Sequence, residues 1–390
     1  MMVRNPAKDA VAIVGLGTTP YRRDAGGKSP LALACDAAVA ALADCGLAPQ
    51  DVDGVGATTV PSGSIQAALG VGEVGWWVNV TMPVSLVMME AVNAVFSGAC
   101  TTALVCHATY RGAGASRSAA ADPFRVHAVG DAHGHNLAMQ PETPSGTFGY
   151  CAWAGRYLHD AGCGREVFGR IAVNSRTNAT RNPHALFREP LTMDEYLAGR
   201  MIREPLSIFD MDPPVDSGDA FVVTTAERAR DLVDRPVYVH AGSLGRTGHP
   251  YADQLTDYQH TGKEIVADRL WAKSDLTLED VDVFYPYDGF SIMAVSWFEA
   301  FGYCKTWEAP EFLADQWDDA GNRLLLDSRV PVNTHGGSLS EGATQGAGHW
   351  REAVDQLRGT AGDRQVDGAS CALLAPGGFM WNATGFVLRA

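Results

Sequence analysis

Two nine-residue stretches decide the fold prediction. Residues 47–55 read LAPQDVDGV and residues 276–284 read LTLEDVDVF, with Leu, Asp, Val and Asp at the same relative places. In each stretch a short helical turn leads into an apolar run of the kind that forms a buried strand. The sequence therefore predicts an internal repeat with a period of about half the chain length.

The elements around the two stretches repeat in the same order. A strand and an amphipathic helix precede each copy, and a helix followed by a small-residue strand comes after each. The first copy has these elements at 10–15, 31–45, 90–98 and 103–107, and the second at 236–244, 264–272, 352–359 and 369–375. This order predicts two similar α/β halves related by a pseudo-twofold axis, residues 1–235 and residues 236–390.

A long irregular region interrupts the first half. It runs from about residue 110 to 216 and is rich in Gly, Pro, Arg and His. Because the region is too long for a simple connection, we interpret it as a loop domain with functional surfaces. One helix, at 165–180, is clear within it.

Composition excludes several classes of function. The net charge is −15, from 30 basic and 45 acidic residues, so neither nucleic acid nor an anionic membrane is expected as a partner. The short apolar stretch near the N-terminus predicts no membrane span, and we expect a cytoplasmic protein. Eight scattered cysteines form no CxxC pair, which predicts neither a zinc ribbon nor disulfides.

Four motifs, in order along nearly the whole chain, resemble the sterol-carrier-protein type of thiolases, also called lipid-transfer-protein thiolases. They are AIVGLGTTPYRR at 12–23, RNPHALFREPLT at 181–192, REPL at 203–206 and NTHGGSLSEG at 333–342. The resemblance implies the thiolase fold, two βαβαβαββ halves in a layered α/β arrangement.

The resemblance also implies that the catalytic residues of a thiolase are missing. The nucleophilic cysteine of the family falls on Thr81 or Met82, and the histidine of its Gly-His-Pro motif falls on Ala343. The second cysteine matches Leu374 or a neighbour. Cys371 lies close to that place, but we interpret it as a packed thiol on a strand.

Another family motif, His-Asp-Cys-Phe, reads Tyr287-Asp288-Gly289-Phe290 here. This change resembles the thiolase-like aldolases that cleave steroid side chains as coenzyme A esters, which also carry Tyr-Asp and lack the nucleophilic cysteine. A tyrosine hydroxyl can donate to an enolate oxygen or remove the β-hydroxyl proton that starts a retro-aldol cleavage. Those aldolases carry a histidine and a tyrosine where this chain has Gly289 and Ala343.

Several residues are candidates for the site. Tyr287 and Asp288 are expected at the carboxyl end of a strand, where α/β sheets bind ligands. In this interpretation Tyr285 shares a strand face with Tyr287. The alternative interpretation is that Tyr285 is a core aromatic. His335 precedes a Gly336-Gly337 bend whose backbone N–H groups are expected to hold the thioester oxygen.

For the other polar residues, our first interpretation is a structural role. Glu341 and His349 flank the altered motif as candidates for the missing base. Asp216 and Asp219 fit the turn that leads from the loop domain back to the core. His127, Asp131, His133 and His135 lie as close together in the sequence as the ligands of a metal site, but they lack the rigid spacing of such ligands. No metal is therefore expected.

The sequence leaves three functions open. The first is a carbon–carbon lyase that cleaves a β-hydroxyacyl-coenzyme A, with coenzyme A as part of the substrate and no covalent cofactor. The second is a catalytically silent thiolase-like subunit that binds acyl-coenzyme A or lipid or acts as a scaffold, and the third is an acyltransferase with an unusual nucleophile. We expect a homodimer through the first-half strands near Trp76 and Trp77, and a small zinc-ribbon and OB-fold partner supplied as a separate chain.

Overall fold

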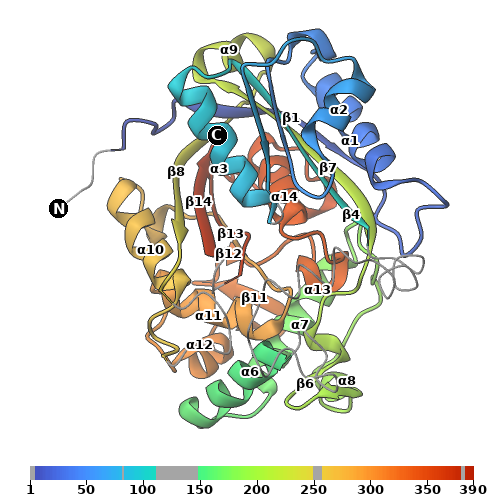
Figure 1. The fold of residues 1–390 in the computed structure, drawn as a ribbon. Helices are drawn as coiled ribbons and strands as arrows, with labels where there is room; N and C mark the ends of the chain where they lie inside the picture. Colours follow the sequence, from blue (N-terminus) through green and yellow to red (C-terminus); the bar gives the residue numbers. More distant parts are fainter. Residues whose placement is uncertain (1–4, 81–82, 111–147, 249–256, 379–382) are drawn as a thin grey trace.

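The computed structural model of the chain describes residues 5–80, 83–110, 148–248, 257–378 and 383–390. Within them one nine-stranded sheet has the order β3-β2-β4-β7-β1-β8-β14-β13-β9 (Figure 1). Its strands are β1 (Val11–Thr18), β2 (Gly54–Ala57), β3 (Trp76–Asn79), β4 (Thr102–Tyr110), β7 (Asp216–Thr225), β8 (Val237–Gly245), β9 (Val283–Pro286), β13 (Cys371–Ala375) and β14 (Ala383–Arg389). The two halves join where β1 pairs with β8, through Ala12↔Tyr238 and Ile13↔Val237.

The helices cover the sheet and fill the space between its halves. They are α1 (Pro30–Asp44), α2 (Ser62–Leu69), α3 (Val84–Ser97), α6 (Phe148–Ala161), α7 (Glu166–Ala179), α8 (Met193–Leu197), α9 (Ala226–Leu232), α10 (Gly262–Lys273), α11 (Ser291–Phe301), α12 (Ala309–Asp315), α13 (Gly337–Glu341) and α14 (Ala347–Arg358). Short strands complete the set: β5 (Met201–Arg203), β6 (Leu206–Ser207), β10 (Trp317–Asp318), β11 (Arg323–Leu326) and β12 (Val330–Pro331).

The repeated Leu-Asp-Val-Asp pattern has the same structural role in both halves. Each copy contains a short 3-10 turn that leads into the parallel strand β2 or β9. The second aspartate of each copy then accepts backbone N–H groups at the start of the neighbouring parallel strand. Asp53 binds Thr101 and Thr102, and Asp282 binds Ser370 and Cys371. The repeat therefore fixes the register of β2 with β4 and of β9 with β13.

Helices α3 and α14 form the central layer. One buried cluster joins them to strands of both halves, and the indole N–H of Trp350 on α14 donates to the Ser85 hydroxyl on α3 at 3.1 Å. A second cluster packs α1, α2 and α9 on the outer face of the first half, and a third packs α10 and α11 on the outer face of the second. The predicted layered α/β halves are confirmed, whereas the boundary at 235/236 stays a prediction.

The loop region packs against the second half although it is inserted in the first. Its helix α7 contacts α11, α12, α13 and β11 (Figure 1). The four residues with metal-like density, His127, Asp131, His133 and His135, lie outside the described residues, as do Thr81 and Met82. In the parts of the chain that the structure describes, no group of three His, Cys, Asp or Glu side chains has the geometry of a metal site, and no helix has the length and apolarity of a membrane span.

Candidate active site

Tyr287 follows the last residue of β9 and its side chain is 7% exposed. Its backbone N–H donates to the Ala375 carbonyl at 2.9 Å, which continues the pairing of β9 with β13. A Cβ atom at Gly289 would lie 2.6 Å from the Tyr287 hydroxyl oxygen. The phenol therefore folds back over Gly289 and occupies space that any other residue would fill.

The prediction that Tyr285 and Tyr287 share one strand face is wrong. Tyr285 packs in the central cluster and its hydroxyl lies 2.9 Å from the Thr334 hydroxyl, whereas Tyr287 packs in the outer cluster together with Phe284. Because β9 ends at Pro286, the alternation of faces does not continue to residue 287. Tyr285 is a core residue, and burial raises its pKa well above the usual value.

Asp288 is fully buried and held by several donors. Its carboxylate accepts the Ser338 N–H at 2.6 Å, the Leu339 N–H at 3.4 Å and the Ser175 hydroxyl at 3.1 Å. A Cβ atom at Gly337 would overlap this carboxylate, so only glycine fits there. Asp288 is thus rigidly oriented beside the start of α13.

The Gly336-Gly337 bend lies against the carboxylate of Asp288, which the next two backbone N–H groups bind. The expected contact of the bend with a thioester oxygen stays a prediction. The Gly336 N–H is also engaged, because it donates to the Asn333 carbonyl at 2.8 Å. Gly336 packs on α7, where a Cβ atom would lie 2.6 Å from the Cβ of Ala179.

His335 and His349 form a buried pair. Their ring centroids are 4.7 Å apart and neither side chain is exposed. Nε2 of His349 lies 3.3 Å from Oδ1 of Asp288, and Nε2 of His335 lies 3.9 Å from Oε2 of Glu341. The ring centroid of Tyr287 is 5.7 Å from that of His349. Four of the predicted site residues, together with His349, therefore lie close to one another.

Glu341 is held in a buried ion pair with Arg351 on α14. Its carboxylate also accepts the Asn182 side-chain N–H at 2.6 Å. Arg351 donates to the Tyr21 hydroxyl at 2.8 Å, which in turn donates to Asp219 at 2.6 Å. Asp219 is therefore part of a charged network that joins the two halves, while Asp216, at the start of β7, is where the chain re-enters the sheet.

Sequence reasoning missed a stripe of amides on α7 and the loop after it. Asn174 and Asn178 donate to the Val332 carbonyl at 3.0 and 2.9 Å, and Asn182 donates to the His335 carbonyl at 2.7 Å. The signal was present in the sequence, because asparagines spaced four apart share one helix face. This stripe holds the segment that carries His335.

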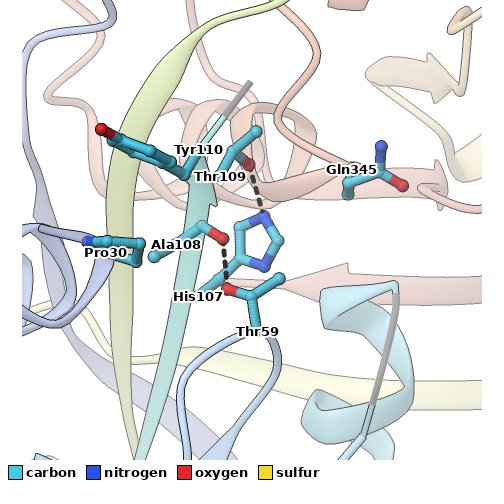
Figure 2. A pocket seen from close by; sticks show the side chains of 7 residues that line it. All are labelled: Pro30, Thr59, His107, Ala108, Thr109, Tyr110 and Gln345. Atoms are coloured by element: carbon cyan, nitrogen blue, oxygen red, sulfur yellow. Dashed lines mark hydrogen bonds between the residues drawn. The ribbon is translucent and has the colours of Figure 1, made fainter. Parts of the chain in front are cut away.

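A cavity of about 150 Å³ opens between the two halves (Figure 2). It is lined by Pro30, Thr59, His107, Ala108, Thr109, Tyr110 and Gln345, none of which carries a formal charge when histidine is neutral. The ring nitrogens of His107 lie 2.7 Å from the Thr58 hydroxyl and 3.0 Å from the Thr109 hydroxyl. The cavity lies at the carboxyl ends of parallel strands β2 and β4, and sequence reasoning did not single it out.

All eight cysteines lie in described parts of the chain and all are free thiols. Five of them are buried and three are partly exposed. Cys371 lies on β13 with 4% exposure, and burial raises its pKa to about 12. Ala343 and Leu374, which match the catalytic histidine and second cysteine of thiolases, are buried as well. None of these side chains provides a reactive thiolate at neutral pH.

The chain is similar to known thiolase-like proteins in sequence and in structure. A model of the family described as thiolase C-terminal domain-like matches residues 245–390. The steroid side-chain-cleaving aldolase of Thermomonospora curvata is 32% identical over 92% of this chain and 93% of its own. The 17-hydroxy-3-oxo-4-pregnene-20-carboxyl-CoA lyase of Mycobacterium tuberculosis is 32% identical over 90% of this chain and 92% of its own.

Solved structures match over the whole chain. The Ltp2-ChsH2(DUF35) aldolase has a TM-score of 0.82 at 29% identity and covers 98% of both chains. A monomeric SCP2-thiolase-like protein from Mycobacterium smegmatis has a TM-score of 0.70 at 17% identity over 99% of this chain and 78% of its own, which shows the shared fold. The protein therefore belongs to the thiolase superfamily and, within it, to the thiolase-like aldolases, and the expected thiolase fold is confirmed.

Proposed function

We propose that this protein is a carbon–carbon lyase that cleaves a β-hydroxyacyl-coenzyme A ester by a retro-aldol reaction. The observation that carries the proposal is Tyr287, which lies with Asp288 at the carboxyl end of β9 in a thiolase fold. The two 32% identical relatives, named as an aldolase and a CoA lyase, support it.

The reaction needs acid–base chemistry and no acyl-enzyme. Tyr287 accepts the proton of the β-hydroxyl group while the bond between the α and β carbons breaks. The products are a ketone and the enolate of a shortened thioester, and the enolate carbon then takes up the proton. Asp288 and His335 support this site, whereas Glu341, committed to Arg351, has a structural role.

The cavity at His107 suits the acyl end of such an ester. Its volume is similar to that of an engineered protein cavity that admits a benzene molecule, so it has room for a short neutral fragment of the substrate. Hydroxyl groups and the Gln345 amide make this lining polar. Its described residues carry no permanent cation for the phosphates of coenzyme A.

The proposal is tested by incubating the protein with 17-hydroxy-3-oxo-4-pregnene-20-carboxyl-CoA and with a panel of other tertiary β-hydroxyacyl-CoA esters. Chromatography with mass spectrometry should find one ketone for each shortened thioester. Tyr287→Phe should lower kcat by about 100-fold or more. Absence of cleavage across the panel, with and without the partner described below, would contradict the proposal.

A silent acyl-CoA-binding subunit is the second candidate function. The resemblance assigns the histidine and the second cysteine of thiolases to the positions of Ala343 and Leu374, and the burial of these two apolar residues favours this candidate. Titration calorimetry separates the two candidates, because a silent subunit binds the esters and leaves them unchanged. An acyltransferase would need a thiol that iodoacetamide labels with loss of activity.

Two assembly proposals accompany this function. First, the chain works with a small zinc-ribbon and OB-fold protein, as the joint name of the Ltp2-ChsH2(DUF35) aldolase suggests for that relative. Co-expression with neighbouring reading frames should then yield a co-eluting zinc protein that raises activity. Second, the chain forms a homodimer through the edge strand β3. The cytoplasmic location stays a prediction that cell fractionation can test.

A further inference from the structure

Three buried groups, Glu341, His335 and His349, are candidates to exchange a proton with Tyr287. The partners of each group in the structure decide between them. Glu341 is neutralised by Arg351, so a proton added there would break a buried ion pair. Burial lowers the pKa of His335 well below its usual value, and the nearby His349 and Arg351 lower it further. His335 is therefore a neutral imidazole. Only His349 lies against a carboxylate that is not paired with an arginine or lysine among the described residues.

His349 is placed in the first turn of α14, whose N-cap is Gly346. Its Nε2 atom lies 3.3 Å from Oδ1 of Asp288, and neither of its two buried ring nitrogens has a hydrogen-bond partner among the described residues. A buried polar nitrogen without a partner costs about 1–3 kcal/mol, so such groups usually bind water or take part in chemistry. His349 combines its open Nδ1 atom with a fixed anion on the other side of its ring.

Asp288 has the properties of an orienting carboxylate. Three donors from α7 and α13 fix it, so it cannot rotate away from His349. In hydrolase triads a buried carboxylate in this position orients the imidazole and stabilises its protonated form. The charged and titratable groups around the pair in the described structure are Tyr287, His335, Glu341 and Arg351.

We propose that His349 is a positioning residue that takes the proton passed on by Tyr287 and returns it, so that Tyr287, His349 and Asp288 form a proton relay. This inference rests on the proposed lyase function and assigns a role to His349 that the motifs of the family do not give. The ring centroids of Tyr287 and His349 lie 5.7 Å apart, and neither His349 nitrogen has a hydrogen-bond partner among the described residues, so the relay passes the proton through one bridging water.

The relay accounts for every proton and electron pair of the cleavage and needs no co-reactant. The β-hydroxyl proton moves to the Tyr287 oxygen as the phenol proton moves to His349, and the electron pair of the O–H bond forms the ketone carbonyl. The pair from the broken carbon–carbon bond remains on the thioester as an enolate. His349 then returns its proton through Tyr287 to the enolate carbon, which restores the enzyme.

The relay is tested with His349→Gln and His349→Ala, compared with His260→Gln, which changes an exposed histidine far from the site in sequence. We expect His349→Gln to lower kcat about 100-fold with KM within threefold of wild type. The pH profile of kcat should lose one ionisation on its acid side. Added imidazole should raise kcat of His349→Ala at least tenfold and leave His260→Gln unchanged.

The outcomes separate the relay from the proposed function. If wild type cleaves the ester and His349→Gln stays within threefold of it, the relay alone is overturned. A loss of kcat with an unchanged pH profile and no rescue by imidazole also overturns it, since a purely structural role predicts that result. If wild type cleaves no ester, both the relay and the lyase function fail. Should His349→Ala not fold, Asp288→Asn replaces it, with the same change in the pH profile expected.

Discussion

Gly289 determines where the Tyr287 hydroxyl lies. The phenol rests over this glycine, where a Cβ atom would lie 2.6 Å from the hydroxyl oxygen. The tyrosine was found from the sequence because it replaces a histidine in a known motif. The orientation of its phenol was not found from the sequence, because that orientation depends on the absence of a side chain at residue 289. The orienting role of Asp288 was missed for a similar reason, since the missing side chain of Gly337 leaves room for its carboxylate.

A single methyl group at residue 289 should therefore displace the phenol. A Cβ atom there would lie 2.6 Å from the hydroxyl oxygen, so Gly289→Ala should lower kcat by about 10- to 100-fold. The matched control is Gly63→Ala in α2, where a Cβ atom meets nothing within 4 Å. Equal kcat for the two variants, measured with the cleavage assay, would show that the phenol position does not matter.

At the scale of elements, α7 joins the loop region to the second half. Asn174, Asn178 and Asn182 hold the backbone of the segment that leads to His335. The helix itself is predictable from its amphipathic pattern, and the expected bounds agree with Glu166–Ala179. Its partner was not predictable, because asparagine periodicity shows a polar face but not which backbone meets it.

Removing one amide should test this contact. Asn178 donates to the carbonyls of Val332 and Asn333, so Asn178→Ala leaves two buried acceptors with fewer donors. We expect a loss of about 1–3 kcal/mol in the free energy of unfolding. Urea titration measures the loss, and Asn93→Ala at an exposed position of α3 is a control with a smaller expected effect. Equal stability of the two variants would contradict the contact.

The network between β7 and α14 should make stability depend on pH. Burial raises the pKa of Asp219 from 3.8 to about 6. A raised folded pKa contributes stability that is present below about pH 4 and is lost as pH rises through about 6. The loss is about 3 kcal/mol, at 1.36 kcal/mol per pKa unit.

Asp219→Asn keeps an oxygen that accepts the Tyr21 hydroxyl but cannot ionise. The stability of this variant relative to wild type should therefore rise by up to about 3 kcal/mol between pH 4 and pH 7. Urea unfolding at both pH values provides the measurement. A constant difference would mean that Asp219 ionises in the fold as easily as in the unfolded chain.

At the scale of the whole molecule, the repeat explains the architecture. Both copies of the Leu-Asp-Val-Asp pattern end in a parallel strand, and Asp53 and Asp282 make the same backbone contacts. Two halves of a layered fold were therefore predictable from spacing alone. The central pairing of α3 with α14 and the cavity between the halves were not, because they depend on how the two copies face each other.

The edge strand β3 should carry the dimer contact. It is the first strand of the sheet, and its Trp77 side chain is 65% exposed, which is unusual for a large aromatic. We expect light scattering to give twice the chain mass for wild type and the single chain mass for Trp77→Glu. The exposed Val39→Glu on α1 serves as a control that should leave the dimer intact. A wild-type monomer at micromolar concentration would contradict this interface.

Intact-protein mass spectrometry during turnover tests the central claim most directly. The claim is that a thiolase fold cleaves a carbon–carbon bond by acid–base chemistry, with no thiol nucleophile. The protein is mixed with the CoA ester and sampled while ketone and shortened thioester accumulate. We predict an unchanged protein mass throughout. A mass increase equal to the acyl fragment, together with release of free coenzyme A, would show an acyl-enzyme and contradict the account.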